Sequence, residues 1–152
     1  MGVRSVETTG PEETEALGAE LAATLHDGDV VLVCGELGAG KTTLVRGASR
    51  GLGVTGPVTS PTFSIGHRYA TDRGLTVSHL DLYRLTGLDG EEPELLADYF
   101  GPARIAFVEW PEDAHAELAH ARLRVRLSHS GGDRRRVEIE ELPRAAEVAS
   151  SR

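Results

Sequence analysis

The chain has 152 residues, of which 39% are hydrophobic and 26% charged, and its formal net charge is −8 at pH 7. This length predicts one domain with a buried core, and the composition is typical of a globular protein. The acidic balance argues against a protein that binds nucleic acid on its own, because affinity for a phosphate backbone requires a positive surface. The sequence has no apolar run of ~20 residues and no basic-then-apolar N-terminus, so we expect a cytoplasmic protein that meets no membrane.

The first third of the chain predicts a strand, a helix and a second strand. Arg4–Thr8 alternates weakly, as a strand does, and Pro11 follows at the start of the predicted helix. Leucines spaced by four residues give this helix one buried stripe: Leu17, Leu21 and Leu25. The apolar run Val30–Cys34 is typical of a parallel strand covered on both faces, and it ends in the only cysteine, a predicted buried thiol.

A glycine-rich motif follows that strand directly. Residues 35–42 read Gly-Glu-Leu-Gly-Ala-Gly-Lys-Thr and match Gly-x-x-x-x-Gly-Lys-Ser/Thr at every fixed position. Lys41 is the only lysine among 16 basic residues, the others being arginines. A compact ammonium fits between phosphates where a planar guanidinium does not. With a predicted helix from Lys41 to Arg50 behind it, the motif indicates a P-loop that binds a nucleoside triphosphate.

The P-loop supplies most of the predicted nucleotide contacts. Its backbone N–H groups can converge on phosphate oxygens, and the hydroxyl of Thr42 is expected to bind Mg²⁺. The residues concerned are Gly38, Ala39, Gly40, Lys41, Thr42 and Thr43. The chain contains no asparagine and no glutamine, which removes the side chains that Ras-type GTPases use to read guanine and to orient water. ATP is therefore the predicted nucleotide.

Beyond the P-loop helix the pattern alternates between further strands, short helices and turns. The predicted strands are Phe63–Tyr69, Leu75–Tyr83, Arg104–Glu109, Leu123–Ser128 and Arg136–Glu141, and the predicted helices are Glu91–Phe100 and Glu112–His120. The first two strands and the last two read as hairpins. The fold class is α/β: a single three-layer P-loop NTPase-like domain at residues 1–143, with a mixed, mainly parallel central sheet, and a flexible tail at 144–152.

Two acids stand at strand ends, where a magnesium site needs them. Glu109 ends the apolar run Ile105–Val108, the layout of a Walker B strand, and Asp81 ends Val77–Leu80 in a similar way. One acid should hold Mg²⁺ while the other orients or deprotonates the attacking water, and the pattern leaves open which does which. His79 shares a strand face with Asp81, and with no further ligand at metal spacing it is interpreted as a packed or hydrogen-bonded histidine.

These pieces, in this order, resemble the bacterial TsaE family, the small ATPases of tRNA threonylcarbamoyladenosine synthesis. The resemblance spans about residues 9–141 and rests on four stretches: Gly35–Thr43, Ser60–Phe63, His79–Leu85 and Val108–Pro111. It implies a subunit that joins a TsaD–TsaB threonylcarbamoyl transferase complex and hydrolyses ATP. It also implies that the modified base is the adenosine next to the anticodon, in tRNAs that read codons starting with A. A partner would carry the tRNA.

The resemblance also implies roles by position. Lys41 and Thr42 would hold phosphates and Mg²⁺, Glu109 would belong to the metal site, and Asp81 would be the second acid needed for hydrolysis. The nucleotide-binding set further includes Thr9, at the start of the matching stretch, and Thr62, in a switch-like loop. The family places an arginine of the last hairpin near the nucleotide. Arg134, Arg135 and Arg136 compete for that position, and Arg136, directly before Val137, is the predicted one.

Two other functions share the P-loop. A small-molecule kinase needs an acceptor pocket and an arginine-bearing lid, but the arginine-dense segment here lies in the C-terminal hairpin, a poor place for a lid inserted between core elements. A nucleotide-sensing module without hydrolysis would be favoured by the loss of Asp81 or Glu109, and both are present.

Overall fold

The computed structural model describes residues 2–35, 38–59, 66–81, 99–110 and 121–142. Seven strands in these ranges form one sheet in the order β1-β7-β6-β2-β5-β4-β3. Their bounds are β1 Val3–Thr8, β2 Val30–Gly35, β3 Gly66–Ala70, β4 Thr76–Asp81, β5 Arg104–Trp110, β6 Leu123–His129 and β7 Arg135–Glu141.

The sheet is parallel in the middle and antiparallel at both sides. The four central strands, β6, β2, β5 and β4, run parallel to one another. The pairs β1–β7, β7–β6 and β3–β4 are antiparallel. The mixed sheet with hairpins is thereby confirmed, and each predicted strand is found, with its described ends within one residue of the predicted bounds. Residues 63–65 and 82–83 of two predicted strands lie outside the described residues. Parallel central strands matter for function, because their carboxyl ends, where ligands bind in α/β sheets, meet along one edge.

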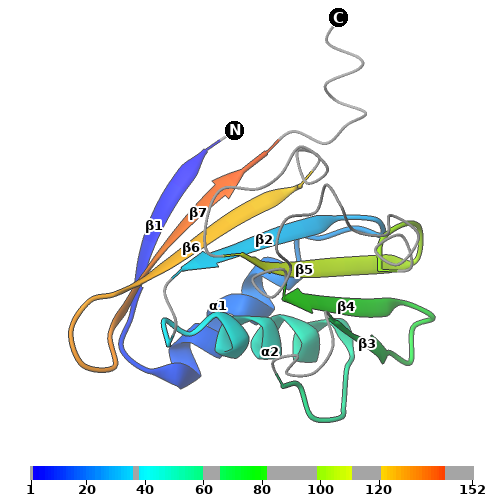
Figure 1. The fold of residues 1–152 in the computed structure, drawn as a ribbon, viewed down its shortest axis with the longest axis horizontal. Helices are drawn as coiled ribbons and strands as arrows, with labels where there is room; N and C mark the ends of the chain where they lie inside the picture. The colour runs from blue at the N-terminus through cyan, green and yellow to red at the C-terminus, as the bar shows by residue number, and fades with distance from the viewer. Residues whose placement is uncertain (1, 36–37, 60–65, 82–98, 111–120, 143–152) are drawn as a thin grey trace, which may run out of the picture.

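Two helices, α1 (Pro11–Ala22) and α2 (Lys41–Leu52), cover the same face of the sheet (Figure 1). The backbones approach closely where the facing residues are glycines. A Cβ on Gly47 would lie 2.0 Å from the carbonyl oxygen of Glu15, and one on Gly18 would lie 2.2 Å from that of Leu44. Any side chain there would force the helices apart, so the glycines fix the position of α2 against α1. The predicted leucine stripe is confirmed for Leu17 and Leu21, which are buried, whereas Leu25 lies beyond the end of α1 and is partly buried against the same core.

Strand alternation divides the core between the two faces of the sheet. Odd-numbered residues of the central strands, such as Val33, Val77 and Phe107, pack with the helices. Even-numbered residues form the second cluster, which includes Leu80, Val108 and the buried thiol of Cys34. Asp81 and Glu109 have the parity of the helix-covered face, so alternation places both on the side of α2.

Several predictions fall on parts of the chain that lie outside the described residues. The predicted helix Glu112–His120 and the tail at 144–152 lie there entirely, as does most of the helix predicted at Glu91–Phe100. In the described ranges, no helix is long and apolar enough to cross a membrane.

Candidate nucleotide and metal site

The Gly35–Thr42 loop joins the end of β2 to the start of α2. Gly40 is the N-cap of α2 with φ 98°, and Gly38 has φ 80°, a backbone region that side chains disfavour. Among the described residues, no atom lies within 4 Å of a Cβ placed on Gly38. The first N–H groups of α2 have no acceptor within the helix, and its positive end faces the loop. This is a backbone arrangement that accepts an anion.

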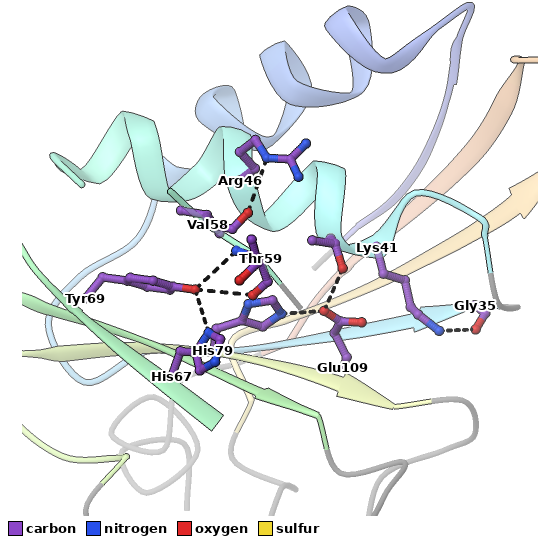
Figure 2. Close-up of polar contacts among 10 residues, drawn as sticks. Gly35, Lys41, Arg46, Val58, Thr59, His67, Tyr69, His79 and Glu109 are labelled. Carbon is purple, nitrogen blue, oxygen red and sulfur yellow. Dashed lines mark hydrogen bonds and ion pairs between the residues drawn. The ribbon is translucent and has the colours of Figure 1, made fainter. Parts of the chain in front are cut away.

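Lys41 folds back across this loop. Its Nζ donates a hydrogen bond of 2.7 Å to the backbone carbonyl oxygen of Gly35, and the side chain is half-buried (Figure 2). The ammonium therefore lies next to the backbone at the start of the loop. Among the other predicted loop contacts, Ala39 is fully buried, and Thr43 is half-buried in the first turn of α2.

Thr42 and Glu109 connect α2 to the sheet. The hydroxyl of Thr42 donates to Oε2 of Glu109 over 3.2 Å. The side chain of Glu109 is only 6% exposed. A helix residue and a strand residue separated by 67 positions thus meet at the carboxyl edge of β5, as the two predicted magnesium ligands should.

Asp81 lies beside Glu109. The two residues are direct partners in the parallel pairing of β4 with β5, so their side chains leave the same face of the sheet at the same level. Asp81 is half-buried. The structure therefore brings together Lys41 and Thr42 at the start of α2, Asp81 at the end of β4 and Glu109 on β5, three elements that are distant in sequence.

His79 is part of this cluster as well. It is fully buried on β4, and its Nε2 is hydrogen-bonded to Oε2 of Glu109 (Figure 2). The predicted hydrogen-bonded histidine is confirmed, and its partner is one of the two predicted acids. Among the described residues no group of three or more His, Cys, Asp or Glu side chains could by itself hold a metal ion. The sequence does not identify Glu109 as the partner of His79, because the register between β4 and β5 cannot be read from it.

The structure places two of the arginines that compete in the last hairpin on different faces of β7. Arg136 is exposed and donates from Nε to the hydroxyl of Ser5 over 3.2 Å, whereas Arg135 donates from Nη2 to the carbonyl oxygen of Gly38 over 3.3 Å. Arg135 has the parity of Val137 and Ile139, whose side chains pack with the helices, and Arg136 points to the opposite face. Arg135 is thus the arginine at the loop. The buried alternation of β7 was a signal in the sequence that could have identified it.

Two predicted nucleotide residues remain. Thr9 is exposed, and its backbone N–H donates to Oε1 of Glu13 over 2.9 Å, a bond that lowers the pKa of that carboxyl. The start of α1 lies near the loop, since a Cβ on Gly40 would be 3.9 Å from Cγ2 of Thr14. Thr62 lies outside the described residues.

The described chain just before Thr62 is anchored on both sides. Arg46 of α2 donates to the carbonyl oxygen of Val58 over 3.4 Å. The hydroxyl of Tyr69 on β3 donates to the carbonyl oxygen of Thr59 over 3.3 Å and lies 3.0 Å from Nδ1 of His67 (Figure 2). Burial raises the pKa of the Tyr69 hydroxyl, which keeps it a hydrogen-bond donor. The segment that leads to Thr62 therefore starts from a fixed point next to α2.

The residues present fit a magnesium–nucleotide complex. Mg²⁺ prefers oxygen ligands and is held in proteins by one or two carboxylates together with substrate phosphates. A hydroxyl and a carboxylate in contact, a second carboxylate alongside and a glycine loop before α2 match the protein's share of that set. Lys41 adds the positive charge that phosphate oxygens require.

Comparisons with known proteins agree with this architecture. The family model described as threonylcarbamoyl adenosine biosynthesis protein TsaE matches residues 8–137. The chain is 46% identical over 118 residues to a protein of Streptomyces coelicolor named tRNA threonylcarbamoyladenosine biosynthesis protein TsaE, covering 77% of this chain and 80% of that one. A Bacillus subtilis protein of the same name is 39% identical over 130 residues, covering 86% and 80%. The crystal structure of Bacillus subtilis YdiB superposes with a TM-score of 0.71 at 34% identity, covering 93% of this chain and 87% of that one.

Proposed function

The chain belongs to the TsaE family, and from that premise we propose that it is an ATP-binding and ATP-hydrolysing subunit in the formation of N6-threonylcarbamoyladenosine. The modified base is the adenosine next to the anticodon in tRNAs that read codons starting with A. The observation that carries the enzymatic part is the contact of Thr42 with Glu109, with Asp81 in register beside it, at the mouth of the Gly35–Thr42 loop. Transfer of a phosphoryl group to water requires a metal-binding hydroxyl, acidic side chains and a lysine that contacts the phosphates, and these groups are present here.

Each residue has a defined role in this proposal. Backbone N–H groups of the loop and Nζ of Lys41 bind the β- and γ-phosphates, and Lys41 exchanges its bond to Gly35 for phosphate oxygens. Thr42 and Glu109 hold Mg²⁺, which when bound supplies positive charge to the same phosphates. Asp81 accepts a hydrogen bond from the attacking water and orients it toward the γ-phosphorus.

The partners are part of the proposal too. A TsaD–TsaB-like threonylcarbamoyl transferase complex would carry out the modification and contact the tRNA, while this chain meets tRNA only indirectly. Its net charge of −8 supports that division, because an acidic chain is repelled by a polyphosphate backbone. The cytoplasmic location stays a prediction.

Phosphate release from Mg-ATP tests the proposal. We expect slow turnover by the protein alone and a clear rise when the purified TsaD–TsaB pair is added, with Lys41→Ala as the blank. Turnover that is indifferent to the pair would contradict the proposed partnership. Transfer of the γ-phosphate to a small-molecule acceptor would identify a kinase instead.

The contact of Arg135 with the loop gives a second expected result. In the proposed complex Arg135 exchanges its bond to the Gly38 carbonyl for a phosphate oxygen, and a charged hydrogen bond of that kind contributes about 1.5–3 kcal/mol. Arg135→Ala should therefore weaken Mg-ATP binding about 10-fold or more. Arg136→Ala is the matched control, because this neighbouring arginine points to the other face of the sheet and contacts Ser5. Titration with a fluorescent ATP analogue measures both variants. Equal losses, or a loss in Arg136→Ala alone, would contradict the assignment.

A further inference from the structure

Within the described ranges, the contacts of the Glu109 carboxylate are made through one of its two oxygens. Oε2 receives the hydroxyl of Thr42 over 3.2 Å and is also bonded to Nε2 of His79. A carboxylate oxygen offers about two lone-pair positions, so these two bonds fill Oε2. The other oxygen is directed toward the side on which Lys41 lies (Figure 2).

His79 has the features of a residue that orients another. Its side chain is 0% exposed, and it leaves the same face of β4 as Asp81, two positions along the strand. Its Nδ1 has no hydrogen-bond partner among the described residues, so the bond to Glu109 is the polar contact that the structure gives this ring. An ionised carboxylate can only accept, and the hydrogen therefore sits on Nε2. Burial of the imidazole in this position is compensated by that single bond.

We propose that His79 is a positioning residue of the metal site, which fixes Glu109 so that Oε1 faces the cation. The inference rests on the proposed function, because it assigns the way in which Glu109 takes part in magnesium binding. The hydroxyl of Thr42 gives its hydrogen to Oε2 and so turns its own lone pairs away from Glu109, free for Mg²⁺. With Oε2 filled by His79 and Thr42, Oε1 is the oxygen left for the metal or for a water bound to it.

Removing the hydrogen bond between His79 and Glu109 should weaken the binding of Mg²⁺ and leave the contacts with the phosphates unchanged. Partners that orient metal ligands typically contribute 10–100-fold to metal affinity. The loop and Lys41 do not touch His79 in the described contacts, so nucleotide binding without metal should stay as in the wild type. The quantity to compare is the factor by which Mg²⁺ tightens the binding of a non-hydrolysable ATP analogue.

Four variants test the proposal by calorimetry with and without Mg²⁺. His79→Leu removes the donor, and we expect the gain from Mg²⁺ to fall by about 10–100-fold. His79→Gln places an amide N–H near the position of Nε2 and should restore most of the gain. His79→Asn carries the same amide one methylene shorter, so it should not. His26→Leu is the control: this histidine is exposed between α1 and β2, its backbone N–H bonds to Asp29, and its replacement should leave the gain unchanged.

The outcomes separate this inference from the proposed function. If wild-type protein binds the analogue no more tightly with Mg²⁺, the proposed magnesium site fails, and the role of His79 fails with it. If the wild type responds and Glu109→Gln does not, but both His79→Leu and His79→Asn respond as the wild type does, the positioning role alone is overturned. Equal losses in the glutamine and asparagine variants would show that His79 acts through packing. Should the leucine variant not fold, the glutamine–asparagine pair decides the question.

Discussion

Replacing Lys41 with alanine should abolish ATP hydrolysis and weaken nucleotide binding about 100-fold. The ammonium is held at the start of the loop by its bond to Gly35 and is available to two phosphate oxygens once nucleotide enters. Each charged hydrogen bond contributes about 1.5–3 kcal/mol, and two of them amount to a factor of about 100 or more in affinity. Calorimetric binding of Mg-ATP and phosphate release measure the two effects.

Lys41→Arg tests whether the shape of the side chain matters in addition to its charge. It keeps the positive charge, in a chain whose other basic residues are all arginines, but replaces a compact ammonium with a broad planar fork. We expect the arginine variant to be as inactive in hydrolysis as the alanine variant. Hydrolysis at the wild-type rate by Lys41→Arg would mean that charge alone matters here, and it would contradict the shape argument drawn from the lone lysine.

Replacing Asp81 and replacing Glu109 should have different effects, one on hydrolysis and the other on magnesium binding. Asp81→Asn should reduce hydrolysis by about 10²–10⁴-fold, the usual contribution of a group that accepts a proton or orients water, while Mg-ATP binds as in the wild type. Glu109→Gln should lose the gain in nucleotide affinity that Mg²⁺ confers, because it removes the charge beside Thr42. Binding with and without Mg²⁺, followed by single-turnover hydrolysis at saturating nucleotide, measures both.

Conservative amides serve as controls in this pair. Asparagine and glutamine keep the size of each side chain and remove only its charge, so the packing between β4 and β5 should persist, which urea denaturation checks. The reverse result, with Asp81→Asn losing the response to Mg²⁺ and Glu109→Gln retaining it, would exchange the two roles. Unchanged hydrolysis in Asp81→Asn would remove Asp81 from the reaction.

Much of the fold could be predicted from short stretches of the sequence. The run Val30–Cys34 had to be buried on both faces, and a parallel central strand is the place that allows this. The glycines of the loop and a lysine at the start of a helix predicted a phosphate site from residues 35–42 alone, and the structure gives Gly35, Gly38 and Gly40 the positive φ that such a loop uses. The positions of Asp81 and Glu109 at strand ends could also be predicted from local sequence, because an acid directly after an apolar run marks the edge of a sheet.

What only the tertiary structure decided is which of these groups meet. Register between strands is set by the packing of whole faces, so the sequence could not show that Asp81 pairs with Glu109 or that His79 bonds to it. The choice of Arg135 over Arg136 depended on which face of β7 packs against the helices. Sequence determined the parts and their chemistry, because motif and periodicity are local. The fold determined their partners, because contacts between distant strands depend on the whole sheet.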